Sequence, residues 1–540
     1  MLRRWLPPSF LLLTAMLLAL PVLAVLVSWL QWTPVAQQIL GEMASTVLPQ
    51  YSLTTVLLCV SVALGVAVVG TSTAVAVTLF EFPGRKTLEW ALLLPLAIPA
   101  YVVAYASTDF LQYSGPLQVW LRESFGLQGR VFPEVRSLGG AAWVFTFALY
   151  PYVYLLARTA LAERGSHLME AARLLGAPLG RRIREVALPL ARPAVAAGVA
   201  LALMETLADF GVASYFGIQT FTAGIYKAWL SMDNRLAAAQ LATVLLAVVA
   251  LLLWLEQHAQ KRMRFAVGRG ARPGSAESQP IRLRGSKAAW AVVVCTLPVL
   301  LGFVLPVLFM LRPLLGAVAA GDTLPWNKFL EWSRNSILLG GGSALLAVLV
   351  ALVLAFAVRR SANVLTRSAV RLVSLGYAVP GAVIVVGLLL PVGWLQAAFP
   401  QSGVGYLVTA TVLGIVWAYL VRFCAVALQS VQSGYARIPG SFDDSARMLG
   451  IGGTGLMLRV HWPLLKRSTA AAALLVFVDV MKELPATLVL RPFNMDTLAV
   501  VTYQLARDER LGEAALPSLA LVLVGLLPVL LLSRTSSRAC

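Results

Sequence analysis

Long apolar runs recur along the whole of this 540-residue chain, and they constrain its fold more than any other feature. An apolar helix of about 18 residues or more can cross the roughly 30 Å hydrocarbon core of a bilayer. Only 12% of the residues are charged, about half the fraction found in a soluble domain. We therefore exclude a water-soluble globular protein and predict an all-α polytopic membrane protein. About 12 transmembrane helices are expected, at residues 9–30, 53–80, 88–107, 140–160, 191–213, 237–257, 289–311, 336–358, 369–396, 403–427, 467–490 and 512–533.

The net charge of +19 is explained by membrane orientation. If the amino terminus is cytoplasmic, most of the 43 Lys and Arg residues fall in segments assigned to the cytoplasm, as the positive-inside rule requires. The interleaved basic and aromatic residues of a nucleic-acid surface are absent. The sequence thus predicts contact with membrane lipid, no nucleic-acid partner, and both termini in the cytoplasm. The first run is expected to be a retained helix, since Trp and Pro stand where a signal peptide would be cleaved.

A basic segment divides the chain into two halves. Residues 258–288 contain eight Lys or Arg and one acid, Glu277, and they include a stretch rich in Gly, Pro and Ser. Such a composition is typical of a cytoplasmic linker between membrane segments. The expected organisation is a first six-helix half at 1–257, this linker, and a second six-helix half at 289–540.

The two halves share an internal repeat, which is the most informative signal in the sequence. Residues 170–190 and 444–464 align without a gap and are identical at seven of 21 positions. Each copy occupies the longest cytoplasmic loop of its half, between the fourth and fifth predicted helices. The halves therefore present two equivalent cytoplasmic elements, as a symmetry axis along the membrane normal would require.

The repeated loop predicts a short exposed helix that ends at a glycine. Gly176 and Gly450 suit the left-handed position that closes a helix, and a proline at the end of each copy marks the start of the next membrane helix. Apolar residues on this helix, Ala171, Leu174 and Leu175, suit a groove on a partner protein. The alternative is a solvated loop without a partner, which the second copy makes harder to accept.

These residues resemble a known motif. The spacing of Glu170, Ala171, Ala172, Gly176 and Pro189 is similar to the EAA motif of binding-protein-dependent ABC importer permeases. The second copy, Asp444, Ser445, Ala446, Gly450 and Pro463, departs from the motif in its first two residues and retains the glycine and the proline. Further segments resemble the fused ferric-iron permeases, namely LPLAIPAYVVAY at 94–105, METLADFG at 204–211, VDVMKELPATLVLRPFN at 478–494 and DERLGEAALP at 508–517.

The resemblance implies a type I ABC importer permease in a bacterial inner (plasma) membrane. In that family the EAA loops dock as coupling helices on the ATPase, so the ten motif residues above are expected to contact two copies of an ATPase subunit. A periplasmic or extracellular binding protein would deliver the substrate. Ferric iron is the expected substrate, and thiamine or another small cation is the alternative, since thiamine permeases share the fused plan.

The chain has no ATP-binding motif of its own. Gly84-Arg-Lys-Thr has the final Lys-Thr of a P-loop but lacks the preceding glycine spacing. ATP and Mg²⁺ are therefore expected on the partner ATPase, and this chain is expected to hold no cofactor and to be no enzyme. Its four cysteines and three histidines are scattered, so no metal centre is predicted. An ion-coupled secondary transporter remains an alternative, although it has no use for two EAA-like loops.

Four carboxylates within the apolar runs are candidates for the translocation route. Glu205 and Asp209 are four residues apart, and Asp479 and Glu483 repeat them at the same offset as the loop repeat. Ionisable residues at membrane depth usually face a cavity or a partner, and hard oxygen ligands suit ferric iron. The alternative is that these acids secure helix ends or one another, with Lys482 neutralising one of them.

Prolines interrupt two of the predicted helices. Pro95 and Pro99 in the third run, and Pro380 with Gly381 in the ninth, leave backbone carbonyls without helical partners. These four residues are candidate gate hinges, although proline is also frequent in transmembrane helices without such a role.

Overall fold

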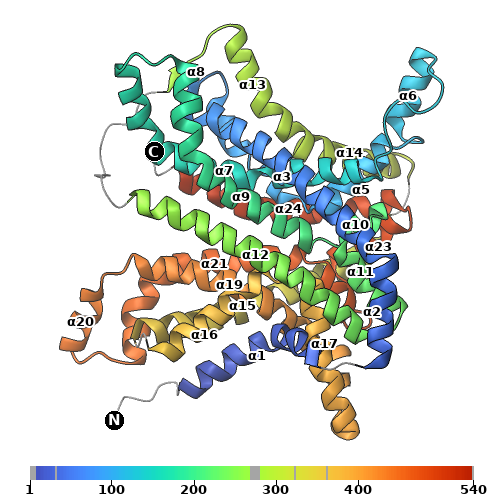
Figure 1. The fold of residues 1–540 in the computed structure, drawn as a ribbon, viewed down its shortest axis with the longest axis vertical. Helices are drawn as coiled ribbons and strands as arrows, with labels where there is room; N and C mark the ends of the chain where they lie inside the picture. The colour runs from blue at the N-terminus through green and yellow to red at the C-terminus, as the bar shows by residue number, and fades with distance from the viewer. Residues whose placement is uncertain (1–7, 31–32, 268–279, 322–323, 361–362, 538–540) are drawn as a thin grey trace. The chain divides into compact units, whose positions relative to one another are not determined.

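The computed structural model describes residues 8–30, 33–267, 280–321, 324–360 and 363–537. Part of the predicted linker, residues 268–279, lies outside this set. Nearly all the described secondary structure is helical, with two strands of two residues each. Two compact units are present, and each is described by itself (Figure 1).

Ten helices of the described residues are long and apolar enough to cross a membrane. A pair of helices, Arg85–Ala97 and Ala100–Phe125, passes the same test together with a bend of 92°, which raises the number to eleven. The predicted all-α membrane class is confirmed, with ten or eleven such helices among the described residues where about 12 were predicted. The eleventh predicted run, 467–490, forms α21 (Trp462–Lys482) and α22 (Pro485–Leu490) instead of one apolar span, because charged residues and Pro485 interrupt it.

Unit 1 comprises Met1–Glu42, Gly224–Leu246 and Pro325–Val501. Its core is three mutually packed long helices, α15 (Trp326–Arg360), α19 (Val412–Ala436) and α21. The first helix of the chain, α1 (Pro8–Val27), packs against α16 (Val364–Ser374) and α17 (Gly381–Ala398). Gly387 permits this contact, since a Cβ there would overlap the carbonyl of Pro21. The remaining elements are η1 (Ser28–Leu30), η4 (Lys227–Ser231), η6 (Gly376–Ala378), η7 (Pro400–Ser402), α18 (Val404–Thr409), α20 (Gly440–Met448) and η8 (Leu456–His461). Helices α2 (Pro34–Thr46) and α23 (Leu498–Arg507) begin in unit 1 and end in unit 2.

Unit 2 comprises Met43–Ala223, Ala247–Leu324 and Thr502–Cys540. Its core is the equivalent trio α3 (Leu48–Leu79), α7 (Leu138–Leu174) and α9 (Leu188–Ala208). Helix α13 (Ser286–Val299) packs against α3, and α14 (Leu305–Ala319) packs against α24 (Leu511–Ser537). The other elements are α4 (Arg85–Ala91), η2 (Leu94–Ala97), α5 (Ala100–Leu111), α6 (Pro116–Phe125), α8 (Leu179–Arg182), η3 (Ile183–Ala187), α10 (Gly211–Phe216) and η5 (Leu300–Val304). Helices α11 (Phe221–Tyr226) and α12 (Arg235–Val267) run through both units.

The two compact units exchange helices between the halves of the sequence. Unit 1 combines the middle helices of the second half with α1 and the start of α12 from the first half. Unit 2 combines the middle helices of the first half with α13, α14 and α24 from the second half. The compact units thus do not coincide with residues 1–257 and 289–540, which remain a prediction about the sequence repeat.

The carboxyl end of the linker is fastened to unit 2. Strand β1 (Phe80–Glu81) follows α3 directly and pairs in parallel with β2 (Ile281–Arg282). The amide of Leu283 donates to the Glu81 carbonyl at 2.9 Å, and Arg85 forms an ion pair with the Glu81 carboxylate at 2.6 Å. This short sheet fixes where the chain re-enters α13.

Candidate functional site

The first repeated loop begins at the end of a single long helix. Helix α7 continues without interruption from the candidate span Leu138–Ala162 to Leu174. Gly176, with φ of +80°, closes it: the Gly176 amide donates to the Arg173 carbonyl at 2.9 Å, and the Ala177 amide donates to the Ala172 carbonyl at 3.0 Å. This pair of bonds is the Schellman motif, which requires a left-handed residue. The predicted helix end at Gly176 is confirmed.

The second loop ends in the same way but begins differently. Helix α19 stops at Ala436, and a separate nine-residue helix, α20, follows Pro439. Gly450, with φ of +74°, donates to the Arg447 carbonyl at 3.0 Å, and Ile451 donates to the Ala446 carbonyl at 2.8 Å. The same Schellman motif therefore stands at the equivalent position of the second repeat, and the predicted helix end at Gly450 is also confirmed.

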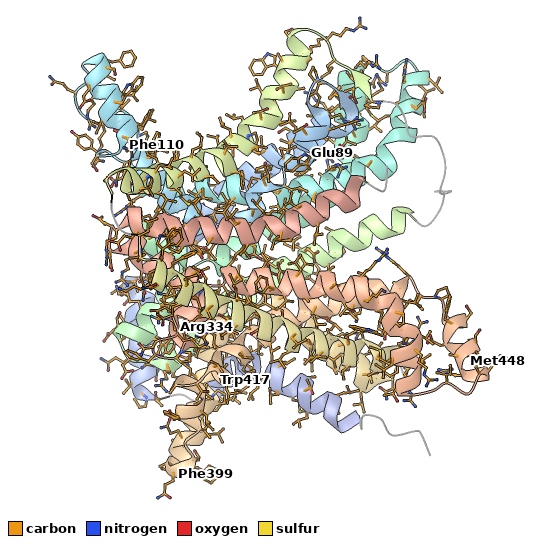
Figure 2. All side chains as sticks on the ribbon, turned by 180° about the vertical axis from the view of Figure 1, so that it is seen from behind. Glu89, Phe110, Arg334, Phe399, Trp417 and Met448 are labelled. Atoms are coloured by element: carbon orange, nitrogen blue, oxygen red, sulfur yellow. The ribbon has the colours of Figure 1, made fainter. Side chains whose placement is uncertain are left out.

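Each capped helix presents two large apolar side chains to solvent. Leu174 and Leu175 are 85% and 88% exposed, and their equivalents Met448 and Leu449 are 89% and 78% exposed. All four lie outside the candidate membrane spans, and Met448 lies at the tip of its loop in Figure 2. Paired, strongly exposed apolar side chains outside the candidate spans make these helix ends candidates for a protein-binding surface. We call these four residues the apolar tips.

The other predicted loop residues frame these tips. The first two motif positions of each copy, Glu170 with Ala171 and Asp444 with Ser445, are exposed, whereas the third, Ala172 or Ala446, is less exposed. After each loop, a short π-helix leads into the next long helix: Ile183–Ala187 in the first copy and Leu456–His461 in the second. Pro189 and Pro463 follow in the first turn of α9 and α21, where proline is tolerated because that amide needs no helical acceptor.

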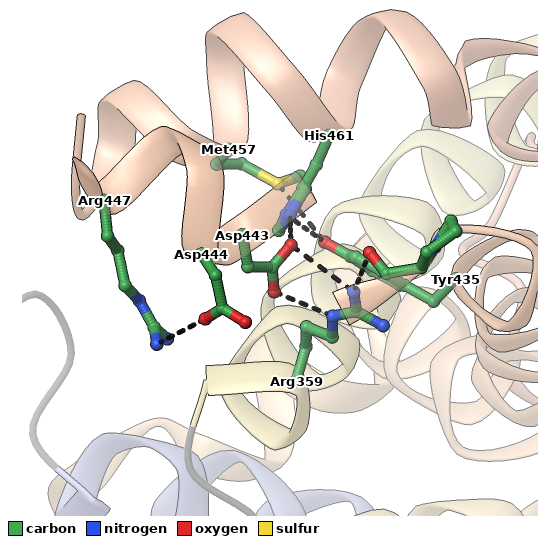
Figure 3. Close-up of polar contacts among 8 residues, drawn as sticks. Arg359, Tyr435, Asp443, Asp444, Arg447, Met457 and His461 are labelled. Carbon is green, nitrogen blue, oxygen red and sulfur yellow. Dashed lines mark hydrogen bonds and ion pairs between the residues drawn. The ribbon is translucent and has the colours of Figure 1, made fainter. Parts of the chain in front are cut away.

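A buried polar cluster, which the sequence did not reveal, holds the second loop (Figure 3). Arg359 donates from Nε to Asp443 Oδ2 at 2.9 Å and from Nη2 to Asp443 Oδ1 at 3.3 Å. His461 Nε2 lies 3.0 Å from Asp443 Oδ1, and its Nδ1 lies 3.3 Å from the Tyr435 hydroxyl. No spacing rule places residues from four separate elements together, so only the tertiary structure shows this cluster.

The electrostatics of the cluster favour an ionised Asp443. Burial alone would raise the pKa of this carboxyl, but the hydrogen bonds and charges of Arg359 and His461 outweigh it, so its pKa lies below the usual aspartate value. An ionised carboxylate only accepts hydrogen bonds, so His461 must donate from Nε2. Asp443 is 7% exposed and His461 is fully buried.

The four membrane carboxylates form two equivalent pairs, one in each unit. Asp209 ends α9, and its Oδ1 accepts from the Val212 amide at 2.7 Å at the start of α10. Glu483 stands at the same place between α21 and α22, where it accepts from the amides of Ala486 and Thr487, each at 2.9 Å. These contacts agree with the packing alternative for both residues. A route role for any of the four acids stays a prediction.

Glu483 also forms a buried ion pair. Arg422 Nη1 lies 3.3 Å from Glu483 Oε1, and the Glu483 side chain is 1% exposed. Gly381 lies against this pair, since a Cβ there would come within 2.9 Å of Glu483 Oε1 and 3.0 Å of Arg422 Nη1. Glu205 and Asp479, the other member of each pair, are half-buried. Among the described residues, no group of three or more His, Cys, Asp or Glu is placed to hold a metal ion.

The predicted proline breaks are present in both units. Pro95 lies within η2, and Pro99 begins α5 after it. Pro380 begins α17 after η6, with Gly381 as the first helical residue. Each break therefore has the same form, a 3₁₀ turn followed by a proline that starts a new helix. The hinge role of these residues stays a prediction.

Comparison with known proteins agrees with this geometry. Residues 68–265, which include the first capped loop and α9, match the family described as "Binding-protein-dependent transport system inner membrane component". The matched region is thus similar to a binding-protein-dependent transport permease component. The chain is 26% identical over 482 residues to the Fe(3+)-transport system permease protein FbpB 2 of Haemophilus influenzae, covering 89% of this chain and 88% of the relative.

Two further relatives place this match in context. The chain is 27% identical over 515 residues to the "Probable ABC transporter permease protein y4fN" of Sinorhizobium fredii, covering 89% of this chain and 87% of that protein. The sulfate transport system permease protein CysT of Escherichia coli is 29% identical over 191 residues, which is 34% of this chain and 66% of CysT. Similarity over nearly the whole chain is thus found with proteins of similar length, and CysT matches about a third of it.

Proposed function

We propose that this permease is the membrane-spanning subunit of an ATP-driven ABC importer that carries ferric iron. The observation that carries the proposal is the pair of Schellman-capped helix ends at equivalent positions of the repeat, each with two exposed apolar side chains. Two equivalent protein-binding tips suit a partner present in two copies, and they match the motif position of the family. An ion-coupled secondary transporter would need neither tip.

The proposed partners follow from the two ends of the transport cycle. Two copies of an ABC ATPase bind the apolar tips and hydrolyse ATP with Mg²⁺, because this chain lacks a P-loop. A binding protein delivers the substrate from the opposite side of a bacterial inner membrane, with both termini of the permease cytoplasmic. Membrane lipid surrounds the apolar helices, and the chain itself carries no cofactor and performs no covalent chemistry.

Ferric iron is favoured by the extent of the similarity. The relative named as an Fe(3+)-transport permease matches 89% of this chain, whereas the sulfate and molybdenum permeases match 34–35%. Carboxylates at Glu205 and Asp479 would attract a cation and repel an oxyanion. Sulfate ranks below ferric iron as a candidate substrate, and it is suggested only by the names of shorter relatives. Thiamine remains the alternative substrate from the sequence resemblance.

The test is uptake of labelled substrates in cells that lack this chain and in cells that regain it. We expect labelled Fe³⁺ uptake to depend on the chain, and labelled thiamine, sulfate and molybdate uptake to be indifferent to it. Purification of the restored permease should bring an ATPase with it. Restoration of sulfate or thiamine uptake alone would replace iron by that substrate, and the absence of any ATPase would overturn the importer proposal.

A further inference from the structure

The two apolar tips are attached to the membrane helices by different means. In the first loop the tip belongs to α7, a single helix of 37 residues that also includes the span Leu138–Ala162. In the second loop the tip belongs to α20, which is separated from the span helix α19 by the turn at Arg437–Pro439. A movement of the first tip is transmitted to the membrane span through one continuous helix. The second tip has no continuous helix to its span.

The cluster around Asp443 restores a connection for the second tip. Arg359, the next-to-last residue of α15, grips the Asp443 carboxylate of α20 with two nitrogens and also donates to the Pro439 carbonyl at 3.0 Å. His461, at the end of η8 and next to α21, binds the same carboxylate. One side chain of α20 is thus tied to two long helices of the unit 1 core. We call Arg359, Asp443 and His461 the clasp.

Other residues fix the histidine of the clasp from its remaining sides. Tyr435 of α19 contacts His461 through its hydroxyl and also edge-on, with ring centroids 5.2 Å apart. Phe356 of α15 packs edge-on against the imidazole with ring centroids 5.7 Å apart. Met457 of η8 accepts from the Tyr435 hydroxyl at 3.5 Å. The charged or titratable groups that face His461 are therefore Asp443, Arg359 and Tyr435, and each comes from a different helix of unit 1.

Among the side chains that the structure describes, the first loop shows no counterpart of the clasp. Three cluster residues are replaced at the equivalent positions of the first half by buried apolar residues: Asp443 corresponds to Met169, His461 to Ala187 and Tyr435 to Leu161. The polar cluster therefore occurs where the helix is broken, and apolar packing occurs where the helix is continuous. A buried ion pair seldom adds net stability over an apolar core, but it does specify one geometry.

The arginine of the clasp has an equivalent that is used differently. Arg85 stands at the position of the first half that corresponds to Arg359. It pairs with Glu81 at 2.6 Å and donates from Nε to the Val77 carbonyl at 2.7 Å, so it secures the turn after α3. Among the described side chains, an acid on the capped helix meets this arginine in the second half only.

We propose that the clasp is a positioning device that makes α20 move as one body with α15 and α21, in place of the helical continuity that α7 provides. The proposal rests on the proposed function, because it assigns the clasp to coupling between the ATPase and the membrane helices. The two halves of the permease then transmit ATPase movement by unlike means, one through a backbone and one through side chains. Arg359, Asp443 and His461 are positioning residues that bind neither ATP nor substrate.

The test measures coupling in the assembled transporter. We compare the parent with Asp443→Asn, Arg359→Lys and the double variant, and record substrate imported per ATP hydrolysed in proteoliposomes. Loss of the clasp should lower this ratio by about 2- to 30-fold, while the amount of bound ATPase stays the same. Arg359→Lys keeps the charge and loses the two-nitrogen grip, so it should lie between the parent and Asp443→Asn.

A matched control removes the charge of an exposed ion pair elsewhere. Arg130 and Glu134 lie 3.1 Å apart with both side chains more than half exposed, so Glu134→Gln should leave the ratio unchanged. A ratio that stays at the parent value in Asp443→Asn and Arg359→Lys would overturn the proposal. So would an equal drop in all three variants, including Glu134→Gln.

A second measurement does not depend on the ATPase. Amide hydrogen exchange of the full chain should become at least about tenfold faster in α20 of Asp443→Asn, because hydrogen bonds to a charged group are lost. The end of α7 should exchange as in the parent. Unchanged exchange in α20 would overturn the clasp itself. Faster exchange in Asp443→Asn, together with a parent permease that binds no ATPase, would instead reject the proposed function and leave the clasp as a structural device.

Discussion

At the scale of single residues, two glycines close the helices that carry the apolar tips. Gly176 and Gly450 both adopt the left-handed conformation and both close a Schellman motif. The surrounding space is open, since no atom outside the local chain lies within 4 Å of a Cβ built at either position. Substitution there would be opposed by backbone conformation alone, and not by a steric clash.

This openness makes the glycines a clean test of the coupling loops. Gly176→Val combined with Gly450→Val should cost roughly 1–2 kcal/mol at each helix end through the left-handed conformation, so the tips are displaced while the membrane helices are untouched. We expect transport per inserted molecule to fall severalfold. Gly180→Val is the control, because Gly180 lies in the same loop without a positive φ. Unchanged transport and ATPase binding in the double variant would remove the loops from the coupling site.

Asp443 predicts a defined response to acid. Its pKa is lowered in the folded protein, so its carboxylate stabilises the fold above the unfolded value of about 3.9. That contribution is lost as the pH falls through the lower folded value. The stability difference between the parent and Asp443→Asn should therefore be constant from neutral pH down to about pH 4 and shrink below it. A difference that grows on acidification, measured by thermal unfolding in detergent, would contradict this assignment.

At the scale of elements, the broken helices decide what the membrane carboxylates do. Asp209 and Glu483 each stand where one helix ends and a short helix begins, and both accept hydrogen bonds from the amides of that second helix. Sequence spacing placed each of them on one helical face with its partner, Glu205 or Asp479. The break turns the chain between α9 and α10, and between α21 and α22, so the second acid of each pair is used as a cap.

The two kinds of acid should therefore respond differently to neutral substitution. Glu483→Gln leaves Arg422 buried without a counter-charge and should lower stability by about 3 kcal/mol. Glu205→Gln with Asp479→Asn should instead reduce cation uptake per inserted molecule, if these two line the route, with a smaller loss of stability. Uptake normalised to inserted protein, measured beside thermal stability, separates the two effects. Normal uptake per molecule in the double variant would reject the route role of Glu205 and Asp479.

At the scale of the whole molecule, the exchange of helices makes the two halves of the sequence interdependent. Each compact unit takes its middle helices from one half and outer helices from the other. Helix α1, for example, buries part of its surface against α16 and α17. The two halves must therefore fold together, although the sequence consists of two repeats.

This interdependence predicts the fate of a divided chain. If the chain is divided within residues 268–279, each fragment should be degraded when expressed alone. The reason is that each unit would lack the helices that the other half of the sequence contributes to it. Co-expression of the two fragments should restore both to the membrane and restore transport in part. Fragment levels in membranes, measured by immunoblot, check the prediction. Full accumulation of either fragment by itself would show that its half folds independently.

Topology follows from the charge distribution. The basic linker, together with the six-plus-six layout predicted from the sequence, predicts that both termini lie in the cytoplasm. A reporter fused after Ser536 should therefore behave as cytoplasmic, and a cysteine placed in the linker of intact cells should resist a membrane-impermeant label. The same cysteine should react once the membrane is permeabilised. Labelling in intact cells would reverse the orientation.

The sequence by itself determined the class of fold, the repeat and the glycine-capped helix ends of the two repeated loops. Apolar length specifies membrane helices, because hydrocarbon leaves the backbone no other partner, and Gly176 and Gly450 specify their helix ends because the left-handed conformation favours glycine. The tertiary structure decided which helices share a core and which side chains meet. In the folded chain, α1 packs against helices of the second half, and Asp209 and Glu483 cap short helices. Arg359, Asp443 and His461 meet in one cluster. Contacts between separate helices depend on how those helices pack, and no local pattern in the sequence encodes that packing.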